Sequence, residues 1–248
     1  MEFELEICVN SIQSALAAQQ GGANRIELCD NMAEGGTTPS AGMILQCKKL
    51  LSIQVFPIIR PRGGDFLYTD DEFNVMLQDI IFCKESGCEG VVIGILKADG
   101  SIDTERCARL IAQARPMQVT FHRAFDRSND LAKALEEIIR LGCERILTSG
   151  AEINAEDAIP RLRKLVEQAN GRISIMAGSG VHEGNISYIA LKTGVRQFHS
   201  TAKKVFSSAM FFKGKGELAE HDGEFIILQT SAGKVRKMKQ ALQLSYGT

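Results

Sequence analysis

The sequence has no excess of charge of either sign and no long apolar run, and each absence excludes a class of protein. Lys and Arg total 29 and Asp and Glu total 30, which gives a formal net charge of -1. The basic residues do not gather into a patch, and affinity for nucleic acid depends mainly on neutralising phosphates. No apolar run approaches the roughly 18–20 residues needed to span a bilayer. We therefore expect neither nucleic acid nor membrane among the partners.

Signals for export and for zinc or iron–sulfur binding are also missing. The start, MEFELEICV, lacks the basic and apolar regions of a signal peptide, so we expect a cytoplasmic protein. The seven cysteines include no C-x-x-C pair and match no zinc-finger or iron–sulfur spacing. In a reducing compartment they should mostly be free, buried thiols.

The sequence does contain an alternation of apolar, strand-like runs with helix-forming segments, repeated eight times. Each repeat has about the length of one strand and one crossover helix. Amphipathic segments such as 131–142 and 158–171 lie between the runs. The expected strands cover residues 3–9, 25–29, 55–60, 90–95, 118–123, 145–149, 172–178 and 196–200.

The connections at the two ends of these strands differ in length and composition. Each helix-to-strand junction is short and has a glycine where the helix would end, as in GGANRIEL and LGCERILT. The strand-to-helix loops are longer and more varied, as in CDNMAEGGTTPS and AGSGVHEGN. This asymmetry is typical of a (β/α)8 TIM barrel, whose site lies at the C-terminal ends of the strands. An open, doubly wound sheet is the alternative.

Eight units without a linker or a break in composition predict a single domain over residues 1–248. Residues 201–229 depart from the pattern as an insertion between the eighth strand and the last helix. They contain VFSSAMFF, a GKGE turn and EFIILQT. We expect this insertion to form a small hairpin, a capping element or part of a subunit contact. Phe211 and Phe212 would suit a contact if they are exposed, and burial against the barrel is the alternative.

Two short stretches, FELEICV and NRIELCD, each place a carboxylate and a thiol two residues apart. Side chains two apart on a strand point to the same face. The apolar residues of the first two strands should face the helices, which turns Glu6 and Cys8 into the lumen on the first strand. The same rule turns Glu27 and Cys29 inward on the second.

Arg60 and His122 should join these groups from the third and fifth strands. The eighth strand is ambiguous, since either His199 or Ser200 could face inward. Buried charges are costly unless they are paired, so one interpretation is a structural network of salt bridges. The other is a small-molecule site with Glu6, Glu27, Arg60 and His122 as catalytic candidates, because acids, a base and an arginine around one cavity suit catalysis.

Two loops have features that suit an anion. The loop AGSGVHEGN follows the seventh strand, and Gly178, Ser179 and Gly180 would present backbone N–H groups at the start of a helix. This position is the usual phosphate site of barrels. Arg62 in RPRGGDFLY adds a cation. The alternative is a tight turn that merely requires glycine.

Long blocks of this sequence, in order along the chain, resemble the CutC family, which is named for copper homeostasis. The blocks are GGANRIELC, EGGTTPS, RPRGGDFLY, VTFHRAFD, LTSG and FHSTA, and the opening MEFELEICVNS resembles enterobacterial members. The resemblance implies a cytoplasmic (β/α)8 barrel, a homodimer in bacteria, with a role in copper handling. It also implies that Cys8 and Cys29 bind Cu(I), since the two cysteines assigned to Cu(I) binding in a mammalian relative lie in the E-x-C and I-E-L-C blocks.

Two hypotheses about function follow from these observations. In the first, the protein binds or carries copper through Cys8 and Cys29, because Cu(I) prefers soft thiolates and accepts few ligands. In the second, it is an enzyme on a small, phosphorylated metabolite. Glu27 or Glu6 would then be the general base, His122 the acid, and Arg60 an electrostatic clamp. The partner is accordingly either a copper ion or a small anionic ligand.

Overall fold

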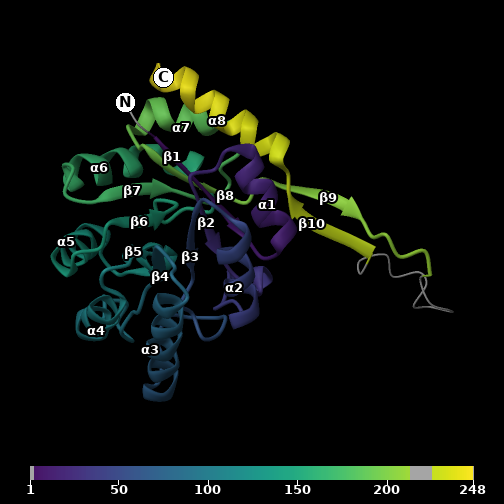
Figure 1. Cartoon of the computed structure of the whole chain (residues 1–248). Coiled ribbons are helices and arrows are strands. Elements are labelled where there is room, and N and C mark those ends of the chain that lie inside the picture. The colour runs from purple at the N-terminus through teal and green to yellow at the C-terminus, as the bar shows by residue number, and fades with distance from the viewer. Residues whose placement is uncertain (1–2, 213–224, 248) are drawn as a thin grey trace.

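The computed structural model describes residues 3–212 and 225–247, and eight parallel strands form its centre (Figure 1). The sheet order is β3-β2-β1-β8-β7-β6-β5-β4. A parallel bridge from Ile58 to Val92 joins the end of β3 to β4 and brings the two edges together. The fold is therefore the predicted TIM barrel. The strands are β1 Glu4–Val9, β2 Arg25–Leu28, β3 Gln54–Pro57, β4 Gly90–Ile93, β5 Gln118–Phe121, β6 Arg145–Thr148, β7 Ser174–Ala177 and β8 Gln197–Ser200.

Eight α-helices in the described part of the chain surround the barrel, and polar side chains fix where several of them begin. In α5 the side chain of Asp130 accepts the N–H of Lys133, and Gly142 ends the helix at a φ of 83°. A positive φ is easy for glycine, as the repeated junctions predict. The helices are α1 Ile12–Gly21, α2 Ala41–Leu50, α3 Asp70–Glu85, α4 Thr104–Ala114, α5 Leu131–Leu141, α6 Ile159–Ala169, α7 Ile186–Thr193 and α8 Ala232–Tyr246.

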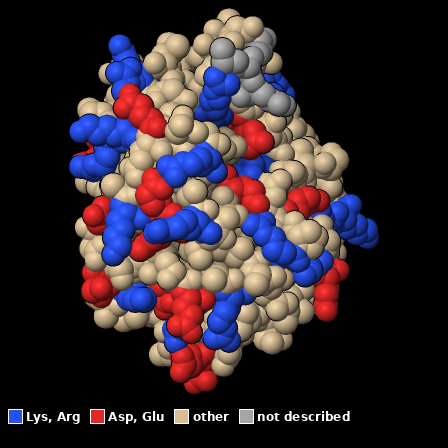
Figure 2. Space-filling model, turned by 90° about the vertical axis from the view of Figure 1, so that its left-hand side faces the viewer, with Lys and Arg blue, Asp and Glu red and all other residues tan. Residues whose placement is uncertain are grey.

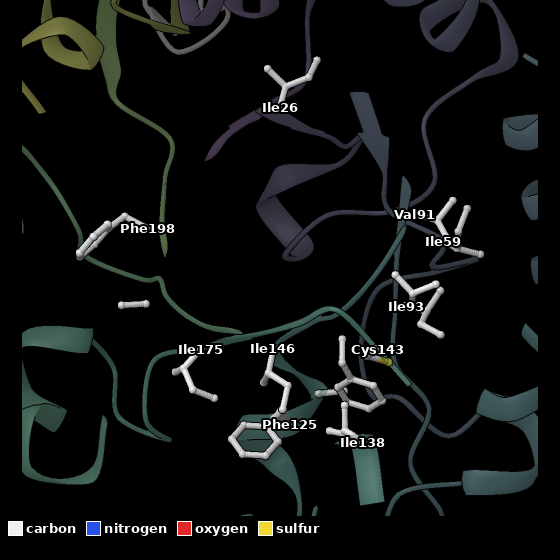
Figure 3. Packing of buried hydrophobic residues seen from close by; sticks show 14 of the residues in the cluster. Ile26, Ile59, Val91, Ile93, Phe125, Ile138, Cys143, Ile146, Ile175 and Phe198 are labelled. Atoms are coloured by element: carbon white, nitrogen blue, oxygen red, sulfur yellow. The ribbon is translucent and has the colours of Figure 1, made fainter. Parts of the chain in front are cut away.

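The apolar side chains form two layers on opposite faces of the sheet. The outer layer packs between strands and helices and includes Ile26, Ile146 and Phe198 (Figure 3). The inner layer lies in the lumen and consists of Cys8, Cys29, Phe56, Ile58 and Val92, with Met32 packed against it. Alternation along the strands therefore places the two thiols inside the barrel, as predicted.

Charged side chains fill the lower lumen, towards the N-terminal ends of the strands. The guanidinium groups of Arg25 and Arg145 both lie against the ring of Phe56, at 5.0 and 5.1 Å from its centroid. Arg25 forms ion pairs with Glu4 and Glu6. Burial and the nearby charge of Arg25 lower the pKa of Arg145 to about 10. This layer closes the lumen below the thiols.

The insertion contains two antiparallel strands, β9 (Lys203–Ser207) and β10 (Ile226–Thr230). They project from the barrel as a ribbon, beside the start of α8 (Figure 1). Phe211 and Phe212 are exposed rather than buried against the barrel, and residues 213–224 of the insertion lie outside the described part of the chain.

The surface gives two further facts. On the face shown in Figure 2, basic and acidic side chains are interspersed, with no large area of one sign. Within the described ranges, no helix combines the length and the apolar character needed to cross a membrane.

Candidate functional site

The thiols of Cys8 and Cys29 meet at the C-terminal ends of two neighbouring strands. Cys8 lies near the end of β1 and Cys29 directly follows β2, and the parallel register sets Cys8 opposite Glu27. The two Sγ atoms are 3.3 Å apart, and both cysteines are buried. Adjacent strands lie about 4.8 Å apart, so inward side chains at matching height meet in this way. The structure thus brings together the two cysteines that the sequence proposes as metal ligands.

Glu27 completes a group of three potential ligands with these cysteines. Its Oε2 accepts from the Sγ of Cys29 at 3.4 Å, and one ligand atom from each residue lies within 4.8 Å of the others. The contact with Cys29 lowers the pKa of Cys8 to about 5, with further help from His199. Burial and the charge of Cys8 raise the pKa of Glu27. The Cys8 thiolate therefore lies beside a carboxyl group that tends to keep its proton.

His199 on β8 belongs to the same cluster. Its Nδ1 lies 2.7 Å from Oε1 of Glu6, and its Nε2 lies 3.7 Å from Oε2 of Glu27. Burial disfavours the imidazolium, but the contact with Cys8 and the charges of Glu27 and Glu6 raise the pKa of His199. The sequence left its orientation open. The neighbouring residue Phe198 could have indicated this orientation, because it is buried in the outer layer and so turns His199 inward.

Glu6 lies below this cluster rather than in the open part of the site. It is fully buried and bonded to Arg25 and to His199. Burial alone would raise the pKa of its carboxyl, but the charge of Arg25 and the contact with His199 lower it to about 2. A carboxylate held in this way orients the imidazole. The geometry gives Glu6 a positioning role, while a role as general base stays a prediction.

A cavity of about 370 Å³ opens above the cluster, at the end of the barrel where TIM-barrel sites are built. Six of the ten residues predicted for a site line it, and Glu6, Cys29, Arg62 and Gly178 do not. The wall is completed by apolar side chains and by residues that sequence reasoning missed, including Arg123 and His182. The predicted residues in the lining are Cys8, Glu27, Arg60, His122, Ser179 and Gly180.

Arg60 holds two loops in place over the cavity. Its guanidinium donates to the carbonyl oxygens of Glu34, Gly36 and Gly64, each at 2.7 Å. The guanidinium also lies 5.1 Å from the centroid of the Phe66 ring. Only its Nε remains without a partner among the described residues. Most of its donors are therefore occupied by the protein itself.

Arg62 lies outside the cavity and supports the same region from the surface. Its Nε donates to Glu72 at 2.6 Å, and its Nη1 lies 3.0 Å from Asp65. Both pairs are partly exposed. Anion binding by Arg62 stays a prediction, and the contacts seen here fix the start of α3 and the preceding loop.

His122 lines the cavity and carries a buried hydrogen-bond donor. Its Nδ1 accepts the backbone N–H of Ala124 at 3.1 Å, so the proton of the neutral ring is on Nε2. Burial, together with the charge of Arg60, lowers the pKa of His122 to about 3. The Nε2 atom is buried and has no hydrogen-bond partner in the part of the chain described.

The loop after β7 reaches the cavity and leads into a helix, as predicted. Ser179 and Gly180 line the cavity, whereas α7 begins at Ile186, after a turn over residues 181–185. In that turn the side chain of Asn185 donates to the carbonyl of Gly180 at 2.9 Å. The predicted helix therefore follows this loop directly, but the turn separates Gly178, Ser179 and Gly180 from its N-terminus.

Comparison with known proteins gives one consistent result. The sequence model of the CutC family matches residues 3–204. A family protein CutC from Chromobacterium violaceum is 46% identical over 244 residues, which cover 98% of this chain and 99% of the relative. The human copper homeostasis protein cutC homolog is 48% identical over 211 residues, 85% of this chain and 77% of the relative.

A solved structure agrees with the sequence comparisons. A CutC crystal structure from Streptococcus agalactiae superimposes with a TM-score of 0.76 at 39% identity. The match covers 80% of this chain and 98% of that chain.

Proposed function

The chain belongs to the CutC family, whose human and mouse members are named copper homeostasis proteins, and we propose that it binds Cu(I) between Cys8 and Cys29. The copper ion is the cargo of the protein in this proposal. Seven cysteines, all free and buried, are compatible with a cytoplasmic location, where thiols stay reduced.

The observation that carries the proposal is the 3.3 Å separation of the two Sγ atoms inside the lumen. Cu(I) is a soft ion that is satisfied by few thiolate ligands, whereas structural zinc usually requires four ligands in a tetrahedron. The group found here offers two thiols and one carboxylate. This donor set suits Cu(I) better than it suits zinc.

His199 gives the dithiol a cationic neighbour. A positive charge beside a thiol favours the thiolate, which is the form that binds metal. The imidazole is held by Glu6 through Nδ1, and Glu6 is held in turn by Arg25. The lower lumen therefore supports the thiol pair.

Anaerobic titration with Cu(I), in competition with a coloured chelator, tests the proposal. The wild-type protein should bind one equivalent, and both Cys8→Ser and Cys29→Ser should lose tight binding. Cys107→Ser is the matched control, because Cys107 is also buried but lies on α4 in the outer layer. Survival of stoichiometric tight binding in the Cys8→Ser and Cys29→Ser variants would overturn the proposal.

We also propose that the β9–β10 ribbon is the subunit contact of a homodimer. Val205 is paired with Leu228, and Phe206 with Ile227, so apolar side chains occupy both faces of the ribbon. Val205 and Leu228 are more than half exposed. An isolated two-stranded ribbon is only marginally stable in water, so a second copy that covers one face would stabilise it.

A second candidate function is favoured by the size of the cavity, which is far larger than a metal ion. In this candidate the protein is an enzyme on a small, phosphorylated metabolite, with Glu27 as general base and the neutral ring of His122 as a hydrogen-bond donor, because its low pKa does not suit the expected role as acid. The raised pKa of Glu27 is what a base working near neutral pH requires. A thermal-shift screen of phosphorylated metabolites should then find one that stabilises the wild-type protein. The Glu27→Gln variant should no longer convert this metabolite. A complete absence of stabilising ligands would contradict this candidate.

A further inference from the structure

We propose that the cavity above the thiols binds a small organic anion, whose charged group is held by the loop after β7 and by Arg123. The ligand class is a phosphate monoester or a carboxylate with a compact apolar body. This site does not depend on the copper site, and it names the groups that would hold the ligand of the second candidate function, on which it rests.

The first argument is a row of backbone donors without acceptors. Ser179, Gly180 and Val181 are consecutive residues of the cavity wall, and none of their N–H groups donates to an acceptor in the described residues. The Ser179 hydroxyl is turned away and donates to the carbonyl of Ile153 at 2.6 Å. Ser179 is half-buried and Gly180 is exposed, so these N–H groups are accessible from the cavity, and a row of free backbone donors in a cavity wall suits a bound anion.

The second argument is independent of that loop and comes from two imidazole rings. Nδ1 of His122 accepts the N–H of Ala124, and Nδ1 of His182 accepts the N–H of Gly184 at 3.0 Å. In the neutral ring each contact leaves the proton on Nε2. The Nε2 of His122 is buried without a partner. An unpaired buried donor is costly, and a ligand acceptor would remove that cost.

Arg123 supplies the positive charge. It lines the cavity, and its Nε and Nη2 contact Asp126 and Ser149 at 2.9 and 3.1 Å. Asp126 also accepts the N–H groups of Ser149 and Ala151. The carboxylate of Asp126 thus anchors Arg123, and Nη1 of Arg123 has no partner among the described residues.

The shape and lining of the cavity define the rest of the ligand. Its volume of about 370 Å³ lies in the range of small-molecule sites and exceeds what an inorganic anion requires. The ring of Phe66 stands 5.0 Å from the ring of His122 and forms a flat wall. Ile58, Leu147 and Val181 add apolar surface. These contacts fit an apolar body of the size of one ring.

Amide NMR titrations of the full chain with three probes test this inference. Phenyl phosphate and benzoate share one body and distinguish a phosphate ester from a carboxylate, and inorganic phosphate provides the charged group alone. We expect saturable shifts at the amides of Ser179, Gly180 and Val181. At least one organic probe should bind about tenfold more tightly than inorganic phosphate, because its body is buried as well.

Three variants distinguish binding at this site from a nonspecific effect of positive charge. His122→Asn keeps an acceptor for Ala124 but removes the donor at the position of Nε2, and Arg123→Gln removes the charge, so each should weaken binding about tenfold. Arg127→Gln is the matched control, because Arg127 lies on the same short helix and does not line the cavity. Because Arg123 is 44% exposed, its variant should fold even if His122→Asn does not.

Three results would overturn the inference. The first is the lack of any shift at these amides with all three probes. The second is a response to inorganic phosphate alone that neither variant changes, which would mean an adventitious ion only. The third is loss of anion binding in a Cys8→Ser, Cys29→Ser double variant that is folded, since the two sites would then not be separate. Retained anion binding with lost copper binding in that variant supports both assignments.

Discussion

Nδ1 of His199 lies 2.7 Å from Oε1 of Glu6, where β8 pairs with β1. This contact connects the charged layer of the lower lumen to the thiols above, because the other carboxylate oxygen of Glu6 is bonded to Arg25. Glu6 is fully buried, so its charge is compensated only by these partners and not by water. The layer below the site is therefore expected to be essential for folding.

Glu6→Gln should destabilise the protein by about 3 kcal/mol or more, because removal of one partner leaves a buried charge on Arg25 poorly compensated. Urea unfolding followed by circular dichroism measures this change. Glu136→Gln is the matched control, since it breaks an Arg–Glu pair at the surface, with Arg172, and should have little effect. Equal unfolding midpoints for the two variants would show that the Glu6 pair contributes no more than a surface pair.

Arg60→Lys should loosen the two loops over the cavity although it keeps the charge. An ammonium group cannot reproduce the fork that donates to the carbonyls of Glu34, Gly36 and Gly64. We expect faster hydrogen exchange at the amides of Asp30 and Thr37, which pair with each other in this loop. Unchanged exchange at these amides would contradict the role assigned to Arg60.

His122 should make the protein less stable as the pH falls from 7 to 5. Its pKa is about 3 in the folded chain, below its ordinary value of 6.5. The unfolded chain therefore takes up a proton in this range while the folded chain does not, and stability is lost as the pH falls. The loss attributable to this residue is about 2 kcal/mol between pH 7 and pH 5.

The difference between wild type and His122→Asn isolates this contribution. Unfolding free energies of both proteins at several pH values should show a shallower acid dependence in the variant. His199 is present in both proteins, so its contribution largely cancels in the difference. Parallel curves for the two proteins would mean that His122 titrates normally in the folded chain.

Leu228→Glu should dissociate the proposed homodimer, because it places a charge opposite Val205 on the exposed face of the ribbon. Sedimentation velocity at several concentrations measures the oligomeric state. Leu244→Glu makes the same change at an exposed leucine on α8 and should leave the dimer intact. A wild-type protein that sediments as a monomer at every concentration would rule out the dimer.

Much of this architecture can be predicted from residue patterns, and the reasons are physical. Alternation of apolar residues turns Glu6, Cys8, Glu27 and Cys29 into the lumen, because the outer face of each strand must pack against helices. The eight strands and the insertion follow from the repeated glycine junctions and the one break in that repeat.

The part that could not be predicted depends on contacts between distant segments. Arg60 was expected to hold a ligand by its charge. Most of its donors are instead occupied by carbonyl oxygens of two loops, which only the folded chain brings together. His199 was left open because β8 has one large apolar residue and therefore a weak alternation. Arg123 went unnoticed because it begins a short helix rather than ending the expected fifth strand, and His182 because it lies in a loop, where no periodicity indicates direction.

X-ray absorption at the copper edge of the Cu(I)-loaded protein tests the central claim most directly. A site between Cys8 and Cys29 predicts two sulfur atoms in the first coordination shell, and loss of this signal in the Cys8→Ser, Cys29→Ser double variant. A first shell of nitrogen and oxygen only, or an unchanged sulfur signal in the double variant, would contradict it.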